Sequence, residues 1–198
     1  MTSHFLMHMN RPEEAMTMID RALKRDPFNV MVLSFYAIDL LFARRYDECI
    51  EAAREVLRAQ PGYPLAQTAL WMAHSAKAMP REAADGAKGV LMGSYADEGL
   101  VAVLERGYAQ GGYTVAMKRA ADALVERFQA SYALPTDIAF FYLEAGERAK
   151  ALEWLEKGFE ARDPSMPYLG FPTFDPIRSD PRFQDLVRRM NLPAGDKK

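Results

Sequence analysis

The sequence predicts an all-α protein built from about five helical hairpins and a C-terminal capping helix. Three observations predict it: sequence signals recur at a constant interval, prolines and glycines stand where helices would begin or end, and no alternating run of β-branched residues is long enough for a strand. The 198 residues are 49% hydrophobic and 26% charged, as in a globular protein with a sizeable core. Disordered, collagen-like and disulfide-scaffold classes are therefore excluded.

The constant interval is clearest among the prolines. The Pro-x-Glu-Ala sequence that begins at Pro12 recurs at Pro80, and Tyr46 lies midway between these two prolines. Pro27 and Pro61 are separated by the same half-distance. This spacing, which we call the repeat interval, is about 34 residues, the period of a helix-turn-helix repeat. We expect hairpins over about residues 1–29, 30–63, 64–96, 97–130 and 131–164.

The hairpin over residues 30–63 carries the best pattern. Ala37 and Cys49 stand where the paired helices approach each other, so small side chains are required. As the single cysteine of the chain, Cys49 cannot form an internal disulfide, and no neighbouring cation suggests a lowered thiol pKa. Cys49 is therefore expected to be a packing residue.

The other helices follow in order from the same interval. Second helices are expected to begin near Pro12 and Pro80, because proline suits the first turn of a helix. After residue 92 the pattern weakens, yet Gly111–Tyr113 and Gly146–Glu147 fit as the turns of a fourth and a fifth hairpin. Pro164 ends the fifth, since a proline inside the helix would cost about 3 kcal/mol.

Residues 165–198 are expected to fold back as a C-terminal cap with disordered last residues. The segment is too apolar for a disordered tail, and the last hairpin needs a cover for its exposed face. Asp180 as N-cap and Pro181 in the first turn predict a final helix through about Met190. The apolar residues of this cap are Tyr168, Leu169, Phe171, Phe174, Ile177, Phe183, Leu186 and Val187.

With this pattern, the chain resembles tetratricopeptide repeat proteins from about Phe5 to Pro164. That resemblance implies a right-handed superhelical stack of hairpins, a TPR-like α-solenoid. A narrower similarity is to the repeat domain that follows a serine/threonine kinase, a winged-helix DNA-binding domain or a cyclase in many bacterial signalling proteins, where it acts as an interaction or regulatory module. The residues that carry it are Ala145–Glu147, Ala151–Leu155, Glu160–Pro164 and Phe174–Leu186.

The first helices of a curved stack line its concave surface, so they are the candidate binding groove. Tetratricopeptide domains that bind a free C-terminal carboxylate place Lys, Arg and Asn there, whereas this chain has apolar and hydroxyl side chains. We therefore expect a non-catalytic module that binds a hydrophobic or amphipathic helix of a protein partner. The expected groove residues are Met31, Ser34, Ile38, Leu41, Leu65, Thr68, Met72 and Ser75.

Two alternative functions stay open at this point. The chain could be the regulatory or oligomerisation domain of a longer bacterial signalling protein, or an accessory subunit that binds an enzyme. In addition, Phe5, Leu6, Met7 and Met9 lie on a first helix that is shorter than the repeat demands, which predicts a homodimer through this N-terminal edge.

Other functions are not expected. With 25 basic and 27 acidic residues the net charge is −2, which gives no general attraction to nucleic acid, and the most apolar stretch is too short to cross a membrane. No signal peptide is recognisable, so we expect a cytoplasmic protein. No catalytic motif or cofactor fingerprint is present. His4 and His8 have the i,i+4 spacing of helical metal sites, but no third ligand stands nearby in sequence, so no metal is expected.

Overall fold

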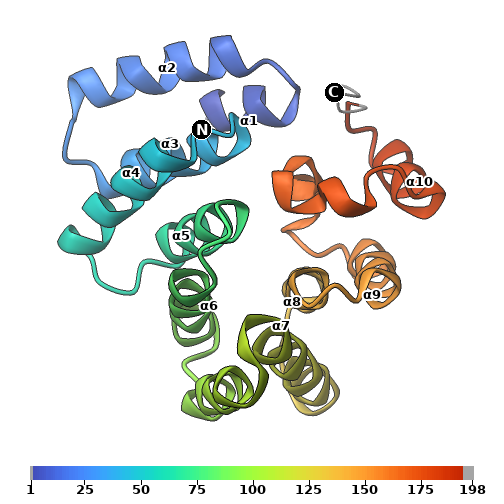
Figure 1. Cartoon of the computed structure of the whole chain (residues 1–198). Helices are drawn as coiled ribbons and strands as arrows, with labels where there is room; N and C mark the ends of the chain where they lie inside the picture. Colours follow the sequence, from blue (N-terminus) through green and yellow to red (C-terminus); the bar gives the residue numbers. More distant parts are fainter. Residues whose placement is uncertain (1, 194–198) are drawn as a thin grey trace. The chain divides into compact units, whose positions relative to one another are not determined.

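The computed structural model describes residues 2–193, and within this range the chain is helical with no β-strand, as predicted. These residues form two compact units, which meet in sequence at Ser94 and Tyr95 (Figure 1). The expectation of disordered last residues concerns 194–198, which lie outside the described residues.

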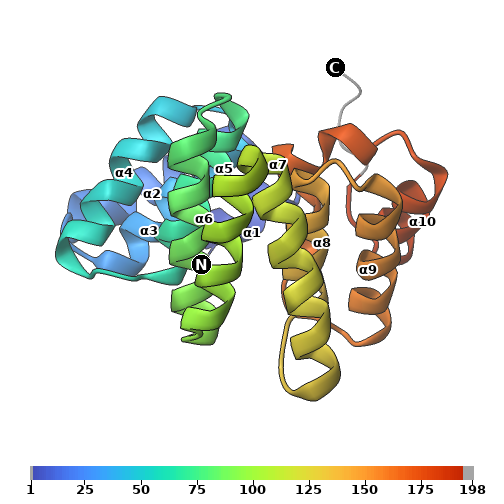
Figure 2. The same ribbon diagram turned by 60° about the horizontal axis from the view of Figure 1, so that its bottom comes forward.

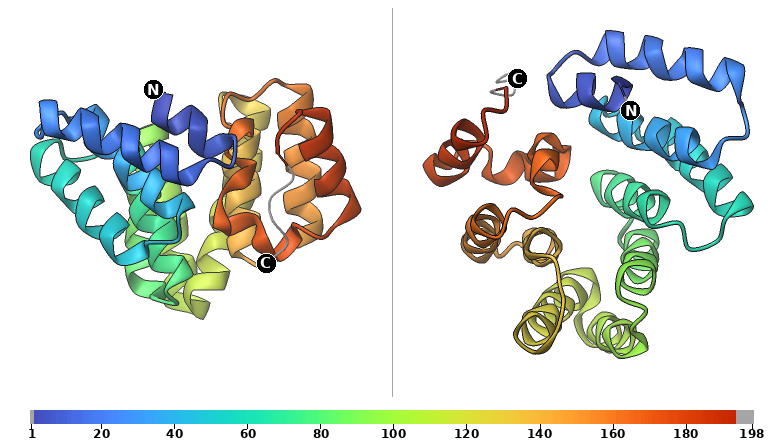
Figure 3. Two further views of the ribbon diagram at one scale, coloured as in Figure 1. Left: turned by 90° about the horizontal axis from the view of Figure 1, so that it is seen from above. Right: turned by 180° about the vertical axis from the view of Figure 1, so that it is seen from behind.

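The first unit consists of consecutive helical hairpins. Helix α1 packs against α2, α3 packs against α4, and α3 also packs against α5 of the next hairpin (Figure 3). Asn29 caps α3 by accepting a hydrogen bond from the Val32 backbone N–H at 3.1 Å. The helices are α1 (Thr2–His8), α2 (Pro12–Arg25), α3 (Val30–Phe42), α4 (Tyr46–Ala59), α5 (Pro64–Ala76) and α6 (Pro80–Tyr95).

The second unit begins with α7 (Glu98–Ala130), which is two helices joined at Gly111 and Gly112. Both glycines have non-helical backbone angles, and a Cβ added to Gly107 would lie 2.8 Å from the Ala116 Cα. Gly107 and Ala116 are nine residues apart, and in a straight helix that rises about 1.5 Å per residue they would be separated by roughly 13 Å. Their close approach shows that the chain reverses direction at Gly111 and Gly112. The predicted turn of a fourth hairpin is therefore confirmed.

The fifth hairpin pairs α8 (Pro135–Glu144) with α9 (Arg148–Glu160), which pack side by side (Figure 2). Asp163, just after α9, is buried and connects the end of α9 to the start of α8. It accepts hydrogen bonds from the Thr136 backbone N–H at 2.9 Å and from the Thr136 hydroxyl at 2.6 Å. Because Thr136 lies in the first turn of α8, this contact satisfies a backbone donor that the helix leaves unpaired.

The turn inside each hairpin contains a residue with a positive φ in both units. One residue in each turn has a positive φ, between +54° and +78°, and successive members of this set are one repeat interval apart. The repeat is thus present in the backbone as well as in the sequence. The five residues are Asn10, Arg44, Ala78, Gly112 and Gly146.

A second set with the same spacing lies in the second helices. All of its members are completely buried, where the second helix of a hairpin meets its neighbours. Cys49 belongs to this set, and its thiol contacts the Ala69 carbonyl oxygen at 3.8 Å. The expected packing role of Cys49 is confirmed. The set is Ala15, Cys49, Ala83, Met117 and Ala151.

The predicted C-terminal cap is present. The chain after α9 forms η1 (Met166–Gly170), η2 (Pro172–Ile177) and α10 (Pro181–Arg189), and these pack on α8 and α9. Asp180 caps α10 by accepting from the Arg182 backbone N–H at 2.8 Å, as expected. Of the eight apolar cap residues, Tyr168 and Val187 are half-buried. The buried six are Leu169, Phe171, Phe174, Ile177, Phe183 and Leu186.

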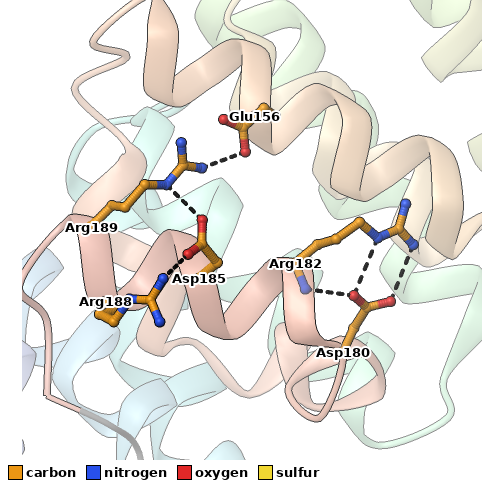
Figure 4. Close-up of polar contacts among 6 residues, drawn as sticks. All are labelled: Glu156, Asp180, Arg182, Asp185, Arg188 and Arg189. Atoms are coloured by element: carbon orange, nitrogen blue, oxygen red, sulfur yellow. Dashed lines mark hydrogen bonds and ion pairs between the residues drawn. The ribbon is translucent and has the colours of Figure 1, made fainter.

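Ion pairs hold α10 to α9 at the surface of the cap (Figure 4). Arg189 of α10 pairs with Glu156 of α9 and, at 2.9 Å, with Asp185 on its own helix. Arg188 also pairs with Asp185. These side chains are substantially exposed, so the buried aromatic residues beneath them contribute most of the cap's stability.

The N-terminal edge is less exposed than the sequence suggested. Leu6 and Met7 are buried in a cluster with Ala15, so their prediction as exposed residues was wrong. Helix α1 has only seven residues, yet it packs with its apolar side against both α2 and α3. Phe5, which is 63% exposed, and Met9 remain at the surface.

Candidate functional site

Half of the expected groove is inaccessible. Ser34 and Ile38 are 0% exposed, and Leu41 and Met72 are almost completely buried, so their expected exposure to a partner was wrong. The three residues on α3 are covered because α1, α2, α4 and α5 all contact this helix, and Met72 lies on α5, which packs against α3 and α4. Positions that would face an open groove on an isolated hairpin are covered by these neighbouring helices.

The other half of the expected groove stays accessible. Met31 is 56% exposed, whereas Leu65, Thr68 and Ser75 are half-buried. Met31 and Leu65 are equivalent residues, one repeat interval apart, in the first turns of α3 and α5, and these helices pack against each other.

Phe28, three residues before Met31 in the chain, is a further exposed apolar side chain that the sequence pattern did not single out. It lies in the turn before α3 and is 82% exposed, the highest value among the exposed large apolar residues. The sequence could have indicated this exposure, because Phe28 stands between Pro27 and Asn29 in an expected turn, where a side chain is not expected to reach the core. We call Phe28, Met31 and Leu65 the first-turn apolar surface.

A pocket of about 550 Å³ lies elsewhere on the same unit and contains none of the expected groove residues. Its walls come from α3, α4 and α5 and carry both charges. Two of its ion pairs are Lys77 with Asp47, and Arg54 with Glu51 at 3.0 Å. The lining residues are Leu33, Tyr36, Asp47, Glu48, Ile50, Glu51, Ala52, Arg54, Glu55, Arg58, His74, Lys77 and Met79.

His74 is the buried polar residue of this pocket. It is 5% exposed, and neither ring nitrogen has a hydrogen-bond partner in residues 2–193. Burial and then the nearby Arg54 lower the pKa of His74 below its ordinary value, so the imidazole is neutral at pH 7. A neutral imidazole offers one donor and one acceptor. Because both nitrogens are shielded from solvent, a ligand would reach them only after side-chain movement.

His4 and His8 are held together by the fold. The sequence offers no third ligand close to this pair, but the structure brings a carboxylate to His4 from a distant part of the chain. The Nε2 atoms of the two histidines are 3.2 Å apart, and His4 Nδ1 lies 2.9 Å from Oδ1 of Asp39, which is 35 residues away in α3. No sequence pattern indicates this contact, because it depends on how α1 packs on α3.

Neither a metal-binding cluster of three or more side chains nor a membrane-spanning helix is found in the part of the chain that the structure describes. No three His, Cys, Asp or Glu side chains in residues 2–193 are arranged to hold a metal ion. Over the same range, every helix is too short or too polar to cross a membrane. No protein-family model, curated protein or solved structure matches the chain. Its function is therefore inferred from its own residues and geometry.

Proposed function

We propose that this chain is a non-catalytic interaction module of the tetratricopeptide type, a right-handed stack of hairpins that binds a hydrophobic or amphipathic helix of a partner protein. The observation that carries the proposal is the recurrence, at the repeat interval, of a turn residue with positive φ in all five described hairpins. A repeated helix-turn-helix unit with this period is typical of solenoids that present an extended surface to proteins.

The binding site that we propose is the first-turn apolar surface. Burial of Phe28, Met31 and Leu65 removes apolar area from water, which favours an apolar partner. Methionine adapts its shape to different ligands, so Met31 suits a helix whose side chains vary. Since burial drives the contact, the affinity should depend only weakly on salt.

A non-catalytic role agrees with the state of the potentially reactive groups. Burial raises the pKa of the Cys49 thiol to about 12, so no thiolate nucleophile is available at neutral pH. Glu48 and Glu51 lie on the exposed surface in ion pairs with Arg45 and Arg54. The ion pair with Arg45 also lowers the pKa of Glu48, which makes this carboxyl a poor general acid at neutral pH.

The test is a binding comparison with matched variants. Partner proteins are captured with the wild-type chain, identified, purified and titrated against the double variant Phe28→Asp/Met31→Asp. We expect at least a tenfold loss of affinity, because two side chains that the partner would bury are replaced by charges. The circular dichroism spectrum should stay unchanged, because both residues are exposed in the unbound chain. Phe5→Asp, which changes an exposed phenylalanine on α1, is the control and should bind normally. Equal affinity of the double variant and the wild type would contradict the proposed site.

A second candidate is a regulatory or oligomerisation role within a longer bacterial signalling protein. The observation in its favour is that residues 174–186, which carry much of that resemblance, are an integral part of the fold, with Phe174, Phe183 and Leu186 buried. An upstream coding sequence for a kinase or a DNA-binding domain in the same reading frame would favour this candidate over the first.

A further inference from the structure

The cluster of His4, His8 and Asp39 places three polar side chains inside an apolar part of the first unit. Ring contacts surround it: His4 lies 4.9 Å from Phe35 and His8 lies 5.2 Å from Phe42, measured between ring centroids. His4 is buried and His8 is half-buried. Polar side chains in such surroundings need a physical reason to be there.

Asp39 is the costly member of the cluster. Its side chain is completely buried in α3, and its Oδ2 atom has no hydrogen-bond partner in the described residues. Its Oδ1 atom lies 2.9 Å from Nδ1 of His4. A buried carboxylate is tolerated when a positive group compensates it, so a cation bound beside the His4–Asp39 pair would stabilise the cluster.

The geometry of the two imidazoles suggests what supplies that charge. A Zn²⁺ ion lies about 2.0–2.1 Å from each histidine nitrogen, and a tetrahedral angle then puts the two nitrogens about 3.3 Å apart. The His4 and His8 Nε2 atoms are already 3.2 Å apart. Their ring centroids are 4.6 Å apart, so the two rings approach each other most closely through their Nε2 atoms.

Asp39 stands where the second shell of a zinc site is usually found. A metal-bound histidine almost always donates its other ring N–H to a carboxylate or a carbonyl, which fixes the tautomer and the ring orientation. With Nδ1 of His4 on Asp39, Nε2 is the atom of His4 that faces the second imidazole, at 3.2 Å from Nε2 of His8.

We propose that His4 and His8 form a two-imidazole site for a transition-metal dication of the zinc class, with Asp39 as the residue that positions His4. No third His, Cys, Asp or Glu in residues 2–193 is placed as a ligand, so water completes the coordination. The affinity is consequently lower than that of a structural zinc site with four protein ligands. Metal binding fixes α1 in helical form and strengthens its docking on α3 through the His4–Asp39 contact.

Isothermal titration of the metal-free full chain with Zn²⁺ tests the proposal. We expect one Zn²⁺ per chain, reversal by EDTA, and no binding of Mg²⁺, which prefers oxygen ligands. His8→Gln should weaken Zn²⁺ binding at least tenfold. Asp39→Asn should weaken it about 10- to 100-fold, the usual effect of losing a second-shell carboxylate. His74→Gln is the matched control, since it removes the third histidine of the chain and should leave the affinity unchanged.

Thermal unfolding gives a second readout that does not depend on the calorimetric signal. Zn²⁺ should raise the melting temperature of the wild type and of His74→Gln, and should leave that of His8→Gln unchanged. If Asp39→Asn fails to fold, the half-buried His8 variant still decides the matter. Absence of Zn²⁺ binding to the wild type would show that the two imidazoles share only a hydrogen bond. Undiminished binding in His8→Gln, or loss in His74→Gln, would place the ion elsewhere, and each of these results overturns the proposal.

Discussion

Asp137 in the second unit has a carboxyl group whose pKa is raised by the fold. Burial raises the pKa of Asp137 to about 6, and the nearby Asp163 acts in the same direction. The Tyr95 hydroxyl opposes the shift by donating a hydrogen bond to Oδ2 at 2.6 Å, while it accepts one from the Leu134 backbone N–H at 3.2 Å. The carboxyl therefore lies in a network that tolerates its charge poorly.

The raised pKa of Asp137 predicts a loss of stability with rising pH. Because the folded chain binds the proton more tightly than the unfolded chain, the free energy of unfolding falls as the pH rises from about 4 to about 6. Asp137→Asn keeps an acceptor for Tyr95 and removes the ionisation. Relative to this variant, we expect the wild type to lose about 2 kcal/mol between pH 4 and pH 7. Urea unfolding of both proteins at both pH values checks this, and identical pH profiles would contradict it.

Gly86 and Gly89, both in α6, are expected to respond differently to alanine. A Cβ on Gly86 would lie 2.7 Å from the backbone N and Cα of Trp71 in α5, so the two helices would have to separate. A Cβ on Gly89 would meet the far end of the Gln67 side chain, which can rotate away. We expect Gly86→Ala to destabilise by about 1–3 kcal/mol. Gly89→Ala should be neutral or stabilising by up to about 1 kcal/mol, because alanine favours the helix.

The comparison is made by urea unfolding under identical conditions. Equal stability of the two alanine variants would show that α5 and α6 have room to adjust, contrary to the close approach at Gly86.

At the scale of the helices, the boundaries were predictable from sequence. Pro12, Tyr46 and Pro80 begin α2, α4 and α6 at successive repeat intervals, and Pro181 begins α10 after its Asp180 cap. These signals act within one turn of the helix, through a fixed proline φ or a capped N–H, so they need no tertiary information.

The exposure of α3 was not predictable in the same way. The repeat offsets assign Met31 and Ile38 to one face of this helix, yet the first is exposed and the second is completely buried. Whether a face is open depends on the helices packed against it, and α3 contacts α1, α2, α4 and α5. The pairing of His4 with Asp39 escaped sequence reasoning for the same reason, since it joins two helices that are not neighbours in sequence.

Two aspartate substitutions on α3 therefore have opposite expected outcomes. Ile38→Asp buries an unpaired charge and should destabilise the first unit by more than about 4 kcal/mol, which is enough to unfold it. Met31→Asp changes an exposed side chain in the first turn, where an acid also interacts well with the helix dipole, so we expect a change within about 0.5 kcal/mol. Circular dichroism and urea unfolding measure both variants. A folded, stable Ile38→Asp protein would restore this position to the binding groove.

At the scale of the whole chain, the backbone keeps the repeat better than the sequence does. After residue 92 the sequence pattern weakens, and the buried position that holds Ala15, Cys49 and Ala83 in the first three hairpins holds Met117 in the fourth, before alanine returns at Ala151 in the fifth. The turn residue Gly112 nevertheless continues the series of positive φ angles at the repeat interval. A helical hairpin is specified by its turn and by the total volume in its core, so single core positions can change identity while the period is retained.

Self-association of the full chain is a prediction of the exposed residues on α1. Phe5 on α1 and Met9 in the turn after it are exposed, while Leu6 and Met7 are already buried, so the apolar area left for a symmetric contact is smaller than the sequence suggested. We expect a weak dimer that dissociates as the chain is diluted below micromolar concentration, since only part of the edge contributes. Phe5→Ser should shift sedimentation toward the monomer, because it removes the largest exposed apolar side chain of α1.

Phe28→Ser is the control for this prediction, since it removes an equally large and even more exposed phenylalanine from the first-turn apolar surface. Sedimentation equilibrium of the wild type and both variants separates the two surfaces. Monomer formation in Phe5→Ser alone supports pairing through the N-terminal edge and leaves Phe28 available to a partner protein. Monomer formation in Phe28→Ser alone would instead make the first-turn apolar surface the contact between two copies. The proposed helix-binding site would then be covered in the dimer, and partner binding would have to compete with self-association.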